Sequence, residues 1–243
     1  MASSEARSKW SIEVKYQRKV LKALGNPTTA VTHRSYFKNS KNDEFWGVPA
    51  TALRKVAAHF RDISLIQIKM LKESRVHDER SLAHAILCLK YKTASSGKDF
   101  VDEQKKIFNF YIRHRRTIRD WSGVDDSAPY IVGHFLLERD KAPLFKLAQS
   151  RNIWDRRIAI VATWWFIRNK KIEPTLKIAK LLLKDEEDLI HKAVGWMLRE
   201  VGKKNAKALE KFLDVNIRAM PRTTLRYAIE RYSIEKRAMY LKK

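Results

Sequence analysis

Apolar residues recur along most of the chain at the three- and four-residue spacing of amphipathic helices. In the segment from Ser11 to Leu24, for example, Tyr16, Val20 and Leu24 fall on one helical face. The Gly-Asn-Pro run that follows ends this helix, because Gly tolerates a left-handed cap and Pro cannot continue a helix. The same pattern predicts further helices at 28–38, 50–60, 62–73, 78–93, 99–118, 127–138, 141–149, 152–169, 173–184, 187–201, 204–214 and 222–232.

The predicted helices are short and follow one another in consecutive pairs, and no segment keeps a heptad long enough for a coiled coil. The chain has only 7 Gly and 6 Pro, which disfavours the many turns of an all-β fold. About a dozen short helices make roughly six two-helix units of the HEAT or armadillo type, which stack into a curved superhelix. We therefore expect an all-α, HEAT-like helical-repeat solenoid that forms a single domain over 1–243, with 1–20 as a partly helical N-terminal extension. The most loop-like stretch is 93–98.

The charge of the chain narrows the class of partner. There are 51 Lys and Arg against 27 Asp and Glu, which gives a formal net charge of +24. Such an excess favours a polyanion as the partner. No apolar run approaches the roughly 20 residues needed to span a bilayer, so we expect nucleic acid and not a membrane. On a curved helical array, the excess predicts a basic concave face that could cradle a duplex.

Cofactor and metal motifs are missing from the sequence. There is no Gly-rich phosphate loop and no His-Glu-x-x-His motif, and the seven His are scattered. Cys88 is the single cysteine, so it cannot form an intramolecular disulfide, and its apolar neighbours predict a small core residue in a protein of a reducing compartment, cytoplasm or nucleus. The start of the chain lacks the pattern of a secretion signal. The acidic run 185–188 is best explained by the favourable charge at a helix start. We expect no cofactor, no metal and a monomer.

Trp121 and Asp125 form the first candidate site. They are four positions apart, so on one helix they would share a face and could flank one ligand. The structural alternative is that Asp125 or Asp126 caps the helix that follows and that Trp121 is buried.

Arg156 and Arg157 form the second candidate site, near a predicted helix start. One guanidinium could bind a phosphate while the other points to solvent or to a carboxylate. The alternative is a solvated basic helix end.

The third candidate is the segment with Gly195, Trp196 and Arg199. Gly inside a helix costs about 1 kcal/mol relative to Ala, so its presence suggests the close approach of a backbone, a side chain or a ligand. Trp196 and Arg199 share a face, and an aromatic surface beside a cation suits a nucleotide. The alternative is a core Trp packed over a neighbouring helix.

Together these segments resemble the signature of the AlkD-type DNA alkylation repair glycosylases, a family of HEAT-like repeat proteins. The residues that carry the resemblance are Trp121, Asp125, Asn152, Trp154, Arg156, Arg157, Lys192, Ala193, Gly195, Trp196, Leu198, Arg199 and Glu200. The stretches 24–27, 36–39 and 45–49 are also similar, and the resemblance runs from about Leu24 to Tyr232.

The resemblance implies a role for each matching residue. Asp125 corresponds to the family's catalytic carboxylate, and Trp121 and Trp196 correspond to the two aromatics that flank the sugar and backbone of the lesion. Arg157 corresponds to an Arg that supports DNA binding at the lesion, and Arg199 to a nearby DNA-contacting cation.

We expect Arg156, the neighbour of Arg157, to contact DNA as well.

Two departures from the family pattern concern the shape of the lesion cleft. Asp120 stands where family members often carry a second Trp, and Ser122-Gly123 stands where a more polar, less flexible pair is expected.

The expected function is therefore that of a DNA glycosylase that removes cationic alkylated purines from duplex DNA without a base-flipping pocket. Asp125 would stabilise the cationic sugar of the transition state and position the attacking water. Two alternatives stay open. The chain could be a non-catalytic HEAT-repeat binder of damaged or branched DNA, or an RNA-binding adaptor, for which charge alone would suffice.

Overall fold

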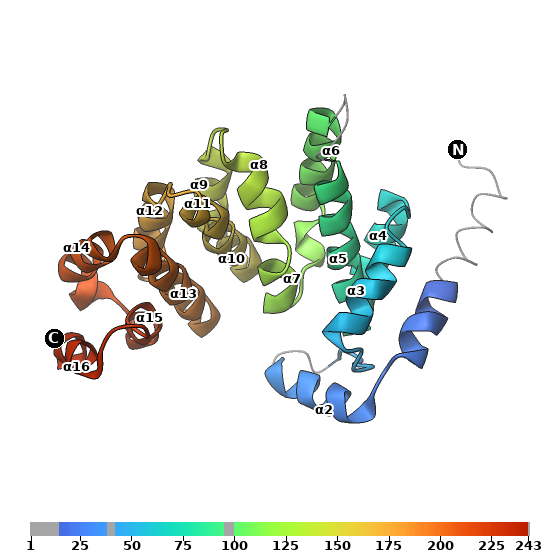
Figure 1. Cartoon of the computed structure of the whole chain (residues 1–243), viewed down its shortest axis with the longest axis horizontal. Coiled ribbons are helices and arrows are strands. Elements are labelled where there is room, and N and C mark those ends of the chain that lie inside the picture. Colours follow the sequence, from blue (N-terminus) through green and yellow to red (C-terminus); the bar gives the residue numbers. More distant parts are fainter. Residues whose placement is uncertain (1–14, 38–41, 95–99, 243) are drawn as a thin grey trace. The chain divides into compact units, whose positions relative to one another are not determined.

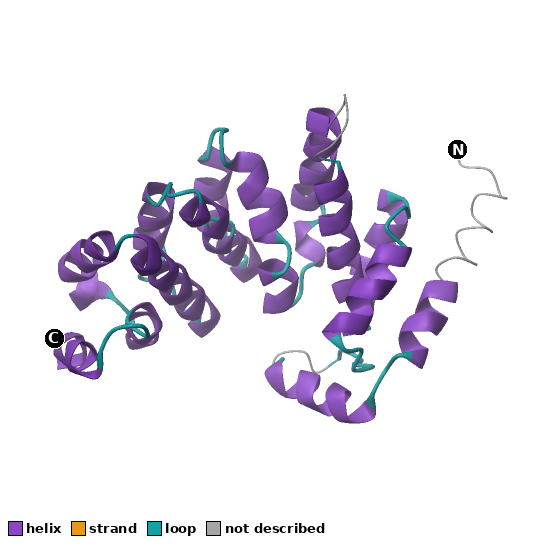
Figure 2. Ribbon diagram, viewed as in Figure 1, coloured by secondary structure: helices purple, strands orange, loops and turns teal. Residues whose placement is uncertain are grey.

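The computed structural model describes residues 15–37, 42–94 and 100–242, and the regular elements within these ranges are all helices (Figure 2). The all-α prediction is therefore confirmed for the described residues. The chain divides into two compact units, one ending at Ser127 and the other beginning at Ala128. Most of the predicted extension 1–20 and most of the loop-like stretch 93–98 lie outside the described residues; the helix predicted from Ser11 is described from position 15 and runs to 23.

The first unit is built around the long helix α5. It contains the helix at 15–23, α2 (Pro27–Tyr36), α3 (Ala50–His59), α4 (Leu65–Lys72), α5 (His77–Thr93), α6 (Phe100–Arg113), the 3-10 turn η1 (Arg115–Thr117) and α7 (Trp121–Asp125). Helices α3, α4, α6 and α7 all pack against α5 (Figure 1). Leu82, Ile86 and Leu87 of α5 are completely buried, so the core of this unit lies along that helix.

The tight loop at 45–49, just before α3, contacts both the start of α5 and the start of α2. The carboxylate of Asp78 accepts hydrogen bonds from the backbone N–H groups of Trp46 and Val48, each at 2.8 Å. Between them, Gly47 has a φ of +74°, and a Cβ there would lie 2.2 Å from the carbonyl oxygen of Asn26. Only glycine fits this position without strain, so the loop is fixed closely against the start of α2.

The second unit consists of short helices that pack in consecutive pairs. It contains η2 (Pro129–Gly133), α8 (His134–Leu136), α9 (Ala142–Ala148), α10 (Ile153–Val161), α11 (Trp164–Arg168), α12 (Glu173–Leu181), α13 (Asp188–Lys204), α14 (Ala206–Asn216), η3 (Ile217–Ala219), α15 (Arg222–Ala228) and α16 (Ile234–Lys242). Helix α9 packs on α10, and α13 packs on both α14 and α15. Helix α13 also contacts α10, so α10, α13 and α15 follow one another through the unit (Figure 1).

The structure differs from the predicted helices at three places. The helix predicted at 152–169 is split into α10 and α11 by a turn at 162–163. Gly133 approaches this turn so closely that a Cβ on it would lie 2.1 Å from the carbonyl oxygen of Ala162. Helix α7 was not predicted, since five residues are too few to show a periodicity. Helix α16 was also not predicted, and its one buried residue, Tyr240, gives no apolar pattern.

Candidate functional site

Helix α7 carries Trp121 and Asp125, and its start is fixed by Asp120. The Oδ1 atom of Asp120 accepts hydrogen bonds from the backbone N–H of Gly123 at 3.0 Å and from the hydroxyl of Ser122 at 2.7 Å. This is an N-terminal cap, which satisfies a backbone donor that the helix leaves unpaired. Trp121 and Asp125 therefore lie on one helix, as predicted. The helix that follows, η2, has Ala128 at its N-cap position and no side-chain cap, so neither Asp125 nor Asp126 caps it.

A buried ion-pair network holds Asp120 to α5. Its Oδ2 atom accepts from Arg80 at 3.1 Å, and the same guanidinium pairs with Asp43 at 2.7 Å. The three side chains are only 3%, 9% and 8% exposed for Arg80, Asp43 and Asp120. Removing one partner of such a buried pair leaves an uncompensated charge. The network thus fixes the N-terminus of α7 to the core of the first unit.

The environment of Asp120 keeps it ionised. Burial alone would raise the pKa of this carboxyl, but the neighbouring His77, the Gly123 N–H, the Ser122 hydroxyl and Arg80 together hold the pKa of Asp120 below its usual value. Nε2 of His77 lies 3.3 Å from the hydroxyl oxygen of Ser122 and 3.9 Å from Oδ2 of Asp120. Asp120 is therefore a structural anion and has no spare capacity for chemistry.

The indole of Trp121 lies on an aromatic cluster. Its ring stacks on that of Phe37, with centroids 5.0 Å apart and planes at 20°. Phe37 in turn stacks on Phe45 at 5.7 Å and contacts His77 at 4.5 Å. The indole N–H also donates to the carbonyl oxygen of Tyr36 at 3.4 Å. Trp121 is only partly buried, so the cluster fixes the plane of a ring that still has exposed surface.

Asp125 and Asp126 are neighbours with different environments. Asp125 is the last residue of α7 and is partly buried, whereas Asp126 is the C-terminal cap residue and is exposed. Desolvation by the surrounding protein, together with the charges of Asp125 and Asp120, raises the pKa of Asp126 to about 6. Asp126 therefore takes up a proton near pH 6, well above an ordinary aspartate, although it is still largely ionised at pH 7.

The Ser122-Gly123 pair has a packing reason in this chain. A Cβ on Gly123 would lie 2.9 Å from Nε2 of His84, which is buried in α5. Burial and the nearby Lys72 lower the pKa of His84 to about 3, so its ring is neutral. Glycine at 123 therefore allows α7 to approach α5 closely, and Ser122 joins the cap of the same helix.

Arg156 and Arg157 lie in the first turn and a half of α10. Arg156 is held by the segment that leads into α13, and Arg157 by the first turn of α13 itself. Arg156 forms an ion pair with Asp185, with Nε–Oδ2 at 2.5 Å and Nη2–Oδ1 at 3.1 Å, and also donates to two carbonyl oxygens of the loop before α10. Arg157 is buried and donates to the carbonyl oxygen of Leu189. The sequence predicted that one arginine of this pair would point to solvent or to a carboxylate, and Arg156 points to the carboxylate of Asp185.

Trp196 and Arg199 lie one turn apart on α13, and both are partly exposed. Gly195 is buried where α13 packs on α15. A Cβ on it would be 2.6 Å from the carbonyl oxygen of Thr224 and 2.5 Å from Cβ of Tyr227. The close approach predicted from this glycine is therefore that of a neighbouring helix. Arg199 forms an ion pair with Glu230, the second residue after α15.

The predicted site residues thus fall into two groups. Trp121 and Asp125 share α7 in the first unit, and the other four lie on α10 and α13 of the second unit, which pack together: Arg156, Arg157, Trp196 and Arg199. Among the described residues, no group of three or more His, Cys, Asp or Glu could hold a metal ion. No helix in the described ranges has the length and apolar character needed to cross a membrane.

A family model described as "DNA alkylation repair enzyme" matches residues 17–232. The chain belongs to the DNA alkylation repair enzyme family. Its fold is similar to a solved structure described as a predicted DNA alkylation repair enzyme from Enterococcus faecalis, with a TM-score of 0.66, 18% identity, and coverage of 86% of this chain and 97% of that chain. No curated protein matches the chain. The resemblance seen in the sequence is thereby confirmed at the level of the DNA alkylation repair enzyme family.

Sequence reasoning missed the residues that position α7 in this member of the family. Asp43, Arg80 and Asp120 come from three separate segments, and no spacing links them. Phe37 belongs to a stretch that contributed to the resemblance, but nothing in the sequence indicated that it stacks on Trp121. The mixture of aromatic and charged residues at 43–46 and 77–80 was the only available signal.

Proposed function

We propose that this member of the DNA alkylation repair enzyme family is a DNA glycosylase that hydrolyses the N-glycosidic bond of cationic alkylated purines, such as 3-methyladenine and 7-methylguanine, in duplex DNA. The product is an abasic site, and the reaction uses neither a cofactor nor a base-flipping pocket. Family membership supports an action on alkylated DNA. The observation that carries the proposal is the placement of Trp121 and Asp125 on one short helix whose start is fixed by a buried ion pair.

The chemistry needs one carboxylate. A purine alkylated at N3 or N7 carries a positive charge, so when the C1′–N bond breaks, its electrons neutralise the ring and the base leaves uncharged. The sugar becomes cationic, and water adds to C1′ with release of a proton. A fixed carboxylate beside C1′ stabilises the developing cation and positions the water, and these interactions are strongest in the transition state. Asp125 has this role.

The environments of its two neighbours favour Asp125. Asp120 is occupied by the cap of α7 and by the ion pair with Arg80. Asp126 has a pKa raised to about 6, so it is the more readily protonated of the two following carboxyls as the pH falls, although it is still largely ionised at pH 7. Asp125 is partly buried at the end of α7. It lies four positions after Trp121, so the two side chains share one face of the helix.

In this proposal Trp121 and Trp196 are each assigned a contact with the sugar and backbone of the lesion. An aromatic face turned toward a cation contributes about 0.5–2 kcal/mol, depending on how well water is excluded. The stack on Phe37 supports the role of Trp121, because a ring whose plane is already fixed loses little conformational freedom on binding. Both indoles keep exposed surface that DNA could cover.

DNA binding follows from the charge of +24, which we propose to be gathered on the concave face of a HEAT-like solenoid. Arg199 contacts the backbone near the lesion, and Arg156 contributes from α10. Arg157 of the same helix is buried and supports this binding surface through its hydrogen bond to Leu189. The carboxylates of Asp185 and Glu230 hold two of these guanidinium groups in defined positions. A guanidinium with several N–H donors can keep such a partner and still donate to a phosphate.

The test is an incubation of the purified protein with methylated duplex DNA. Free 7-methylguanine and 3-methyladenine are measured by mass spectrometry, and abasic sites by alkaline strand cleavage. The proposal predicts equal amounts of released base and abasic sites. Tight DNA binding without release would instead support a non-catalytic binder of damaged or branched DNA, and a preference for RNA would support an RNA-binding adaptor.

A further inference from the structure

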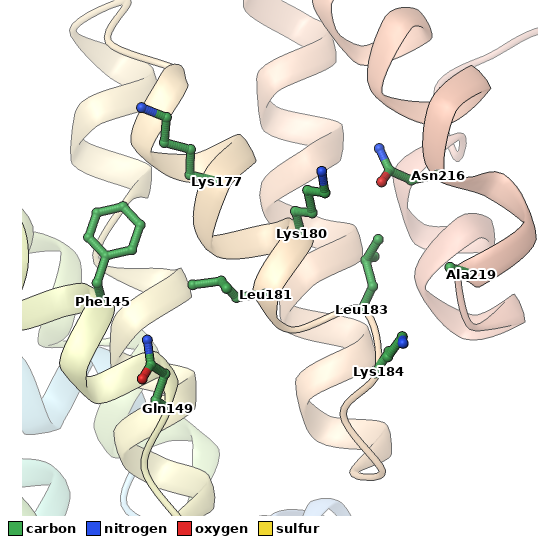
Figure 3. A pocket seen from close by; sticks show the side chains of 9 residues that line it. All are labelled: Phe145, Gln149, Lys177, Lys180, Leu181, Leu183, Lys184, Asn216 and Ala219. Carbon is green, nitrogen blue, oxygen red and sulfur yellow. The ribbon is translucent and has the colours of Figure 1, made fainter.

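A hollow of about 680 Å³ lies in the second unit, away from the residues assigned to DNA. It is lined by side chains of α9, of α12 and the turn after it, and of the end of α14 with η3. Figure 3 shows the residues that matter here, three lysines and three apolar side chains that line the same hollow: Lys177, Lys180, Lys184, Phe145, Leu181 and Leu183. None of the residues assigned to DNA lines this hollow.

The lysines bring positive charge to one place. Lys177 and Lys180 lie one turn apart on α12, Lys184 lies in the turn that follows it, and all three side chains are exposed. Lys177 pairs with Glu173 at 3.2 Å, whereas Lys180 and Lys184 have no ion-pair or hydrogen-bond partner within the described part of the chain. No acidic residue lines the hollow. Two exposed ammonium groups that line the same hollow and have no acidic partner among the described residues do not stabilise the fold, so their placement favours an anionic ligand.

The apolar side chains in the hollow restrict the kind of anion. Leu181 lies between the lysines and is 49% exposed, while Phe145 is partly exposed and Leu183 is buried beneath. The backbone of a nucleic acid offers charge but little apolar surface to cover Leu181 and Phe145. A peptide with acidic and large apolar side chains offers both.

The hollow also belongs to different helices from the proposed DNA contacts. Helix α12 contacts α9, and both pack on α10 (Figure 1). Arg157 lies on α10, and Trp196 and Arg199 lie on α13. A ligand in the hollow would therefore not need to displace DNA from these residues.

We propose that this lysine-rimmed hollow binds an acidic segment of a partner protein in which Asp or Glu residues flank one or more large apolar side chains. The apolar side chains cover Leu181 and Phe145, and the carboxylates pair with Lys180 and Lys184. This pairing of an apolar contact with complementary charge is a common mode of peptide recognition. The proposal is independent of the glycosylase activity.

The test uses a fluorescein-labelled peptide of sequence EDLFEDLLED and measures its binding to the full chain by fluorescence anisotropy. Two control peptides, EDSSEDSSED and KRLFKRLLKR, remove the apolar side chains and reverse the charge. The double variant Lys180→Glu/Lys184→Glu is compared with Lys207→Glu/Lys211→Glu, which makes the same charge change on exposed lysines of α14 at the same spacing. Circular dichroism melting checks that both variants fold.

We expect EDLFEDLLED to bind the wild type, and the Lys180→Glu/Lys184→Glu variant to weaken this binding about tenfold or more, with little change in the α14 control. The serine peptide and the basic peptide should bind more weakly than EDLFEDLLED. Equal effects of the two double variants, or equal binding of the serine peptide, would overturn the proposal. It would also be overturned if the hollow variant weakened duplex DNA binding as much as peptide binding, because nucleic acid would then be the ligand.

Discussion

The ring of Trp121 lies nearly parallel to that of Phe37, with centroids 5.0 Å apart. Phe37 directly follows α2 and Trp121 begins α7, so this stack joins two segments that are 84 positions apart in the sequence (121 − 37). One face of the indole is thereby covered by protein. In the proposed glycosylase, this contact sets the plane against which the sugar of the lesion would lie.

The stack should appear as an energetic coupling between the two rings. We expect the double-mutant cycle of Phe37→Leu and Trp121→Leu, followed by urea denaturation, to give a coupling energy of about 0.5–1.5 kcal/mol, the range of aromatic pairs in proteins. Phe37→Leu alone should also reduce base release, because it keeps apolar volume but loses the flat surface under the indole. Strictly additive effects of the two substitutions on stability would contradict the stacking.

Two glycines of α13 should respond differently to a methyl group. A Cβ at Gly195 would meet the backbone of Thr224 at 2.6 Å, and backbone cannot move away easily, so we expect Gly195→Ala to lower the free energy of unfolding by about 1–3 kcal/mol or more. At Gly202 the Cβ would meet only the end of the Leu209 side chain, at 2.5 Å. Because that side chain can turn and Ala favours the helix, Gly202→Ala should stay within about 1 kcal/mol of the wild type. Urea denaturation of both variants measures the difference, and equal losses would contradict the close packing of α13 on α15.

Lys72 should make the stability of the protein depend on pH. Its side chain is fully buried, its Nζ lies 5.3 Å from the ring centre of Tyr111, and burial lowers the pKa of Lys72 to about 8, an effect that the nearby Cys88 partly opposes. Between pH 8 and 10.5 the unfolded chain binds more protons at this site than the folded chain, so this group makes the wild type more stable as the pH rises.

We therefore expect Lys72→Met to raise the free energy of unfolding at pH 7, by up to about 3 kcal/mol if the full pKa difference applies, and the gain to shrink at pH 10. Urea denaturation of both proteins at the two pH values measures this difference. Comparing the two proteins at each pH removes the contribution of every other titrating group. A gain that does not change with pH would show that Lys72 is not buried as a perturbed amine.

Arg199 should contribute to DNA affinity through a phosphate contact. We expect Arg199→Ala to weaken binding to duplex DNA and to reduce the slope of log affinity against log salt concentration by about one, since about one fewer counterion is released. Arg113→Ala, an exposed arginine of α6 outside the proposed contact set, serves as the control and should leave the slope nearly unchanged. Titrations at several salt concentrations measure both. A change in affinity with an unchanged slope would argue against a phosphate contact by Arg199.

The sequence was sufficient for those parts of the fold that depend on local pattern. The longer helices could be predicted because their buried faces repeat at helical spacing, as in α13, where Ala193, Val194, Met197 and Leu198 are buried. The close approach at Gly195 could be predicted because glycine is costly inside a helix. Family membership could be recognised because its matching segments keep their order.

The structure was needed for what depends on contacts between distant segments. Helix α7 is too short for a periodic pattern, and its position is decided by the ion pair of Asp120 with Arg80, which no spacing in the sequence announces. The pairing of Arg156 with Asp185 joins residues that are 29 positions apart. Such contacts depend on how helices pack, and they determine which carboxylates, such as Asp120, are held in buried ion pairs.

The central claim is that Asp125 is the catalytic carboxylate, and single-turnover release of 7-methylguanine from methylated duplex DNA tests it most directly. We predict that Asp125→Asn lowers the rate by about 100-fold or more while DNA affinity is nearly unchanged, because the carboxylate acts mainly in the transition state. Asp126→Asn removes a carboxylate one position away and should change the rate by less than about tenfold. An Asp125→Asn protein that releases 7-methylguanine at the wild-type rate would contradict the account.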